Sequence, residues 1–99
     1  MTIDYMTQVP IPISAEGLEK FEFSANTTDG VFAFSFWYFL NQWNCWVTLP
    51  TGEKRPIGIY AGNLNWARFL DYSILIVGSN NSITFDDILD IGVYIIKWL

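Results

Sequence analysis

Three aspartates form the one acidic cluster in the sequence, at Asp86, Asp87 and Asp90. Carboxylates at this spacing could bind calcium, or act as the acid and base of a glycosidase. The segment lacks the alternating oxygen ligands and the glycine of a hand-type calcium loop, and a glycosidase pair would need a cleft and a raised pKa. Acidic residues near the positive end of a helical turn explain the cluster more simply. We therefore interpret it as the N-terminus of a helical turn.

The residue types on which most enzymes depend are scarce. The chain has no histidine and a single cysteine, which excludes Ser-His-Asp and Cys-His nucleophile systems and a zinc site built from Cys and His. It also has no glycine-rich phosphate loop. Cys45 lies between Trp43 and Trp46 and is interpreted as an ordinary small buried residue. The sequence predicts a protein that is not an enzyme, with no catalytic residue, cofactor or bound metal.

Aromatic residues are unusually frequent. The chain contains eight Phe, five Trp and five Tyr among 99 residues, which is more than one small core needs. Exposed tryptophan rings could form a flat platform that stacks on sugars. The other interpretation is that most of them fill the core or a subunit interface, and we favour it.

The formal net charge of −5 disfavours nucleic acid as a partner, because a negative surface repels phosphate backbones. The five basic residues are scattered apart from the pair Lys54 and Arg55, so no polybasic segment is available for an anionic membrane. The longest apolar runs are well short of the ~20 residues of a membrane-spanning helix. The N-terminus has neither a basic start nor an apolar signal core. We expect no nucleic-acid or membrane binding, and synthesis in the cytoplasm.

Turn-forming residues recur about every ten positions, which favours short strands over long helices. Period-two alternation predicts strands over residues 18–25, 31–40 and 54–60. Short apolar runs between turns predict strands over 43–49 and 73–77, and β-branched and aromatic residues predict one over 92–99. In 31–40 the aromatic residues at 32, 34, 36 and 38 share one face, and both faces are apolar enough for a central strand. Residues 18–60 are predicted to form a meander of four antiparallel strands.

Other segments are less regular. Residues 9–13 alternate apolar residues with proline, which predicts an edge strand or an extended arm, and residues 1–8 are expected to be a loose arm. Apolar residues in 64–70 recur loosely at helical spacing, which predicts one or two helical turns. Thr84 is a candidate N-cap for another turn through Leu89. The predicted fold class is mainly β: one domain over residues 1–99, a small antiparallel barrel or sandwich of about seven short strands with one or two short helical turns.

A series of short elements extends from about residue 9 to residue 97. They are Ile11-Pro12-Ile13, the strand at 18–23, Phe32-Ala33-Phe34-Ser35-Phe36, Trp46-Val47-Thr48-Leu49 before a turn at Gly52, Gly58-Ile59-Tyr60-Ala61-Gly62-Asn63-Leu64, and Thr84-Phe85-Asp86-Asp87-Ile88-Leu89-Asp90-Ile91-Gly92 before Val93-Tyr94-Ile95-Ile96. In the order and spacing of these elements the chain resembles the small baseplate plug family of contractile-tailed phages, of the cyanophage type. Its turn at 49–52 is shorter than the aspartate-rich turn common in that family.

The resemblance implies a structural β domain at the centre of a phage or prophage tail baseplate, near the hub and spike and below the tape measure. No catalytic residue belongs to that role. We therefore expect assembly with hub, spike and tape-measure proteins in the virion, and a homo-oligomer, because tail centres have rotational symmetry. The residues predicted to bind partners are Trp37, Trp66, Tyr94, Trp98 and Leu99. The first alternative function is a carbohydrate-binding β module that uses exposed tryptophans, and the second is an enzyme subunit or an inhibitor of an enzyme.

Overall fold

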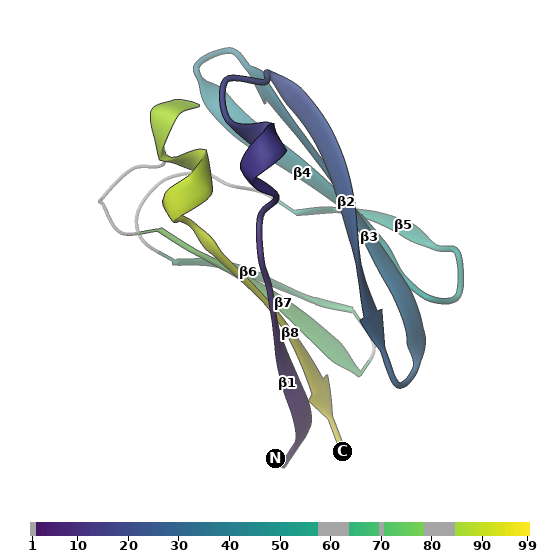
Figure 1. Cartoon of the computed structure of the whole chain (residues 1–99). Helices are drawn as coiled ribbons and strands as arrows, with labels where there is room; N and C mark the ends of the chain where they lie inside the picture. Colours follow the sequence, from purple (N-terminus) through teal and green to yellow (C-terminus); the bar gives the residue numbers. More distant parts are fainter. Residues whose placement is uncertain (1, 58–63, 70, 79–84) are drawn as a thin grey trace.

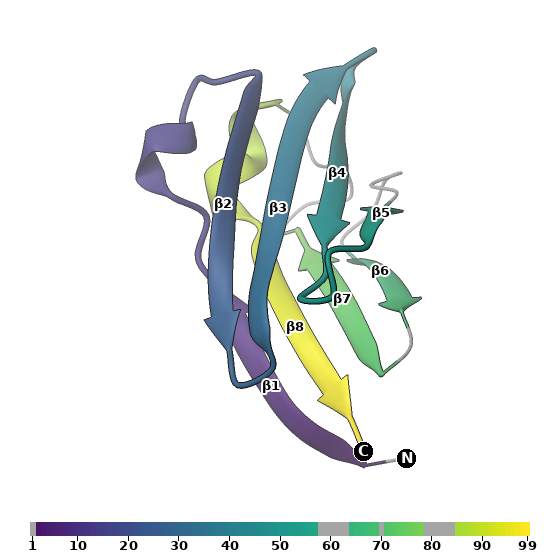
Figure 2. The ribbon, with the colours of Figure 1, turned by 90° about the vertical axis from the view of Figure 1, so that its right-hand side faces the viewer.

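The computed structural model describes residues 2–57, 64–69, 71–78 and 85–99. Within these ranges the chain forms eight antiparallel strands in two four-stranded sheets, which pack as a sandwich (Figures 1 and 2). One sheet has the strand order β2-β3-β4-β5, and we call it the meander sheet. The other has the order β1-β8-β7-β6 and contains both ends of the chain, so we call it the terminal sheet. The predicted mainly β class is confirmed.

The meander sheet follows the sequence prediction closely. It consists of β2 (Lys20–Thr27), β3 (Gly30–Phe39), β4 (Gln42–Thr48) and β5 (Lys54–Ile57). The strand 31–40 was predicted to be central, and β3 is paired on both sides. The turn between β2 and β3 falls on residues 28–29, and Gly30 follows with φ 127°, where an added Cβ would lie 3.0 Å from the Cβ of Pro50. Residues 58–60 of the predicted last strand lie outside the described residues.

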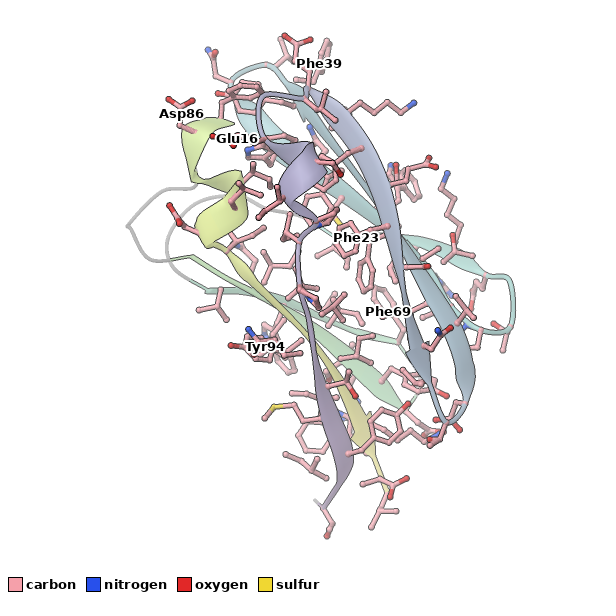
Figure 3. The ribbon with its side chains drawn as sticks, in the orientation of Figure 1. Glu16, Phe23, Phe39, Phe69, Asp86 and Tyr94 are labelled. Atoms are coloured by element: carbon pink, nitrogen blue, oxygen red, sulfur yellow. The ribbon has the colours of Figure 1, made fainter. Side chains whose placement is uncertain are left out.

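Alternation in β3 and β4 places one side of each strand in the core. Phe32, Phe34 and Phe36 are each at most 1% exposed. Trp43 and Cys45 of β4 are buried against the same side. In Figure 3, Phe23 from β2 and Phe69 from the terminal sheet both point into the space between the two sheets. The prediction that Cys45 is a small buried residue is confirmed.

The terminal sheet corrects two sequence predictions. It consists of β1 (Ile3–Val9), β6 (Leu64–Phe69), β7 (Tyr72–Val77) and β8 (Gly92–Trp98). Residues 3–9 are therefore not a loose arm, because they pair along β8. The segment 9–13, predicted to be an edge strand or an extended arm, begins with Val9 as the last residue of the edge strand β1, continues outside any strand with extended backbone at Pro12, and ends at Ile13, the first residue of the 3-10 turn η1 (Ile13–Ala15). The predicted helical turns at 64–69 are strand β6, because a hairpin partner in β7 supplies its hydrogen bonds and overrides a weak helical spacing; position 70 lies outside the described residues.

Both short turns pack at one end of the sandwich (Figure 1). The predicted turn through Leu89 is the 3-10 turn η2 (Phe85–Asp90). Its proposed N-cap, Thr84, is outside the described part of the chain. The Phe85 ring stacks on Trp43, with centroids 5.7 Å apart and planes at 6°, and Ile88 is 3% exposed. η2 thus closes this end of the core.

A polar network joins the two sheets at the other end. The Tyr5 hydroxyl donates a hydrogen bond to the Asp29 carboxylate (2.9 Å), and the Lys97 ammonium lies 3.3 Å from the same carboxylate. Lys97 also lies 3.3 Å from the Tyr72 hydroxyl. The hydrogen bond from Tyr5, together with Lys97, lowers the pKa of Asp29. Asp29 belongs to the β2–β3 turn and the other three residues to the terminal sheet, so the network ties the hairpin to that sheet.

Candidate functional site

Four of the five predicted partner-binding residues belong to the terminal sheet or continue from it. Trp66 lies in β6, Tyr94 and Trp98 lie in β8, and Leu99 follows β8 directly. Trp37 lies in β3, in the other sheet. The structure therefore brings four of the predicted residues into one sheet and separates the fifth from them.

The strand register places the aromatic residues of the terminal sheet on its outer face. Trp66 pairs with Leu75, and Leu75 pairs with Tyr94, so these three residues form one row across β6, β7 and β8. Their neighbours along the strands, such as Ile74 and Ile95, are fully buried against the meander sheet. Since side chains alternate along a strand, the row must project away from the core. Figure 3 shows Tyr94 on the side of the sheet opposite to Phe69.

A second row lies beside the first. Ser73 of β7 pairs with Ile96 of β8, and Ile96 pairs with Met6 of β1. We define the outer apolar face by six residues from the four strands of the terminal sheet. They are Met6, Trp66, Leu75, Tyr94, Ile96 and Trp98. Met6 and Trp66 are each 60% exposed and Leu99 at the end of the face is 78% exposed, whereas Ile96 is covered by its neighbours and only 6% exposed.

Trp98 is held in place by the fold. Its indole Nε1 donates a hydrogen bond to the Ser73 hydroxyl (2.7 Å), and the Arg68 guanidinium lies 5.7 Å from the ring centroid. Ser73 is fully buried although it belongs to an outer row, which fits a serine hydroxyl covered by the tryptophan bonded to it. Trp98 therefore presents part of its ring at a fixed position, and it also stabilises the end of β8.

Tyr94 depends on a glycine in a similar way. A Cβ placed on Gly92 would lie 2.9 Å from Cε2 and 3.2 Å from the hydroxyl of Tyr94, so the ring covers the space that a side chain at Gly92 would need. Beside the ring is an open groove of about 420 Å³, lined by residues of β7, β8 and the end of η2 together with Gln8. The outer apolar face is therefore uneven, because Trp66 and Met6 project into solvent and the groove beside Tyr94 is a depression.

The described residues offer little of the chemistry that a catalytic or metal site needs. Asp86 and Asp90 of the acidic cluster are exposed at η2. No set of three or more His, Cys, Asp or Glu residues in the described ranges could hold a metal ion. Burial raises the pKa of the Cys45 thiol far above its ordinary value, which leaves the thiolate unpopulated. None of the described helical segments is long and apolar enough to cross a membrane.

Three residues of the outer apolar face were not singled out from the sequence: Met6, Leu75 and Ile96. The available signal was the alternation in residues 3–9, where Tyr5, Thr7 and Val9 face the core and Met6 faces out.

Comparison of the chain with protein-family models, with curated proteins and with solved structures finds no match. The resemblance to baseplate plugs therefore rests on the order of sequence elements alone.

Proposed function

We propose that this protein is a non-enzymatic assembly domain that binds other proteins through the outer apolar face of its terminal sheet. The observation that carries the proposal is the concentration of exposed Met6 and Trp66, with half-buried Tyr94 and Trp98, on one side of one sheet. Tryptophan, tyrosine and methionine are enriched at protein interfaces, and contiguous exposed apolar surface is rare on monomeric proteins.

We further propose that the partners are proteins of a contractile phage tail baseplate, namely hub, spike and tape-measure proteins, and further copies of this chain in a ring. The support for this assignment is the resemblance in sequence to the baseplate plug family. A face built on a sheet suits such a role, because a sheet presents its side chains at fixed spacing. The corresponding location is the virion, in the tail baseplate.

Trp66→Ser is the substitution that best tests the assembly face. The residue is exposed, so its loss removes interface area with little effect on the core, whereas Trp98 is tied to the fold through Ser73. A tryptophan that acts as an anchor in an interface contributes about 2 kcal/mol or more, equal to about 30-fold in affinity. We expect Trp66→Ser to weaken self-association, or binding to a tail protein, by at least that factor.

The measurement is sedimentation equilibrium over a range of concentrations, together with binding of the purified chain to purified hub, spike and tape-measure proteins. Phe39→Ser is the matched control, because Phe39 is also 60% exposed but lies at the end of β3, in the other sheet. A wild-type chain that remains a monomer at high concentration and binds none of these proteins would contradict the proposal. Equal losses in Trp66→Ser and Phe39→Ser would contradict the assignment to this face.

A further inference from the structure

The outer face of the meander sheet carries two tryptophans that the core does not need. Trp37 and Trp46 alternate along their strands with buried Phe36 and Cys45, so both project outward. Their rings are nearly parallel, with planes at 15° and centroids 6.2 Å apart, and both side chains are half-buried. The solvent-facing side of an antiparallel sheet is normally polar, so this pair of rings calls for a function.

Polar and charged side chains surround the two rings. Together they line a groove of about 340 Å³, a size at the lower end of the range for small-ligand pockets. The polar residues that line it are Lys20, Glu22, Ser35 and Lys54. The Lys54 ammonium lies 5.4 Å from the centroid of Trp46. Among the described residues, the ion pairs join Arg55 to Glu53 and Lys97 to Asp29, so the charges at Lys20 and Glu22 remain available to a ligand.

We propose that this groove binds a carbohydrate. A pyranose ring has an apolar face of C–H groups, which stacks on an indole, and a rim of hydroxyls, which both donate and accept hydrogen bonds. The groove offers both complements: the rings of Trp37 and Trp46, an acceptor in Glu22, and donors in Lys20 and Lys54. Glu22 in the groove and the net charge of −5 oppose a polyanion such as nucleic acid. Charged groups on both flanks oppose an apolar peptide.

This sugar site is independent of the proposed assembly role. Trp37 and Trp46 lie on the meander sheet, and the outer apolar face lies on the other layer of the sandwich, facing away from it (Figure 1). A substitution in the groove should leave association unchanged, and a substitution at Trp66 should leave sugar binding unchanged. The two proposals can therefore fail separately.

The test is a titration of the ¹⁵N-labelled full chain with the neutral sugars cellohexaose, maltohexaose and chitohexaose, followed through the indole N–H signals of the tryptophans. We expect the signals of Trp37 and Trp46 to shift saturably with at least one of these sugars, while those of Trp66 and Trp98 stay in place. No saturable shift with any of the sugars would overturn the proposal, and so would shifts confined to Trp66 or Trp98.

Substitutions in the groove test whether Trp37 and Trp46 contribute to sugar binding. Trp37→Ala and Trp46→Ala should each lower the affinity for the sugar by about tenfold or more. Phe39→Ala is the matched control, since Phe39 is an exposed aromatic residue of the same strand as Trp37 and does not line the groove. Backbone amide spectra show whether each variant is folded. If one variant is unfolded, the affinity of the other variant and the wild-type titration test the proposal. An equal loss of sugar affinity in Phe39→Ala would show that the groove is not the sugar site. The same conclusion would follow if Trp37→Ala and Trp46→Ala weakened protein association and neither they nor the wild type bound a sugar.

Discussion

Phe36→Ala tests whether the aromatic side of β3 forms the core. The Phe36 ring is fully buried and lies 5.4 Å from the Phe21 ring, 5.8 Å from Phe23 and 6.4 Å from Trp43, measured between centroids. Truncating a buried phenylalanine to alanine costs about 3–5 kcal/mol, and each aromatic pair contributes about 0.5–1.5 kcal/mol beyond the area that it buries. With three ring neighbours we expect about 4–5 kcal/mol, a large part of the about 5–15 kcal/mol that stabilises a domain.

For a domain of this size, about 4–5 kcal/mol corresponds to a fall in Tm of about 16–40 °C. The assay is urea unfolding followed by circular dichroism, with thermal melting as a second measurement. Phe39→Ala is the matched control, because Phe39 lies in the same strand but is 60% exposed, and we expect a change within about 0.5 kcal/mol. The reasoning is refuted if the unfolding free energy of Phe36→Ala lies within about 1 kcal/mol of the wild-type value, or if Phe36→Ala and Phe39→Ala lose equal stability.

Three further predictions concern a turn, a carboxylate and a thiol. Leu40 is 80% exposed with φ 54°, a left-handed conformation that disfavours leucine, so Leu40→Asn should raise the Tm by about 4–8 °C, for about 1 kcal/mol of relieved strain. The hydrogen bond from Tyr5 and the charge of Lys97 lower the pKa of Asp29. The contribution of the Asp29 carboxylate to stability is therefore present above its ordinary pKa of 3.8 and is lost as the pH falls through the lowered value. The difference in Tm between wild type and Asp29→Asn should be largest near neutral pH and shrink in acid. Cys45 is 1% exposed with a raised pKa, so the native protein should react with Ellman's reagent only as fast as it unfolds, and the urea-unfolded protein at once.

Local patterns in the sequence were sufficient to predict the meander sheet. Its strands follow one another through short turns, and the phenylalanines of β3 alternate with small or polar residues, so the period of two is easily recognised. Strand β1 was missed because its partner β8 lies at the other end of the chain, and because its core-facing residues Tyr5 and Thr7 are only moderately apolar. Strand β6 was missed because its core-facing side includes Asn65 and Ala67, which give a weak alternation.

The candidate site was predictable in residue type but not in arrangement. Trp37 and Trp66 are predicted from the excess of aromatic residues over what one core needs, and Tyr94 and Trp98 from a C-terminal run that is apolar on both faces. Only the register between β6, β7 and β8 shows that the last three of these residues share a face and that Trp37 does not. Met6 was missed because the alternation in residues 3–9 is weak, and because its place on the face depends on the pairing of β1 with β8.

The same register determines which residues can separate binding from folding. Trp98 and Tyr94 serve both, since Trp98 bonds to buried Ser73 and the Tyr94 ring packs on Gly92. Their loss would weaken association and stability together, and the two effects could not be distinguished. Trp66 and Met6 are each 60% exposed, so most of their area is still available to a partner. If the terminal sheet is an assembly surface, the variants at these two positions should weaken association while their unfolding free energies stay close to that of the wild type.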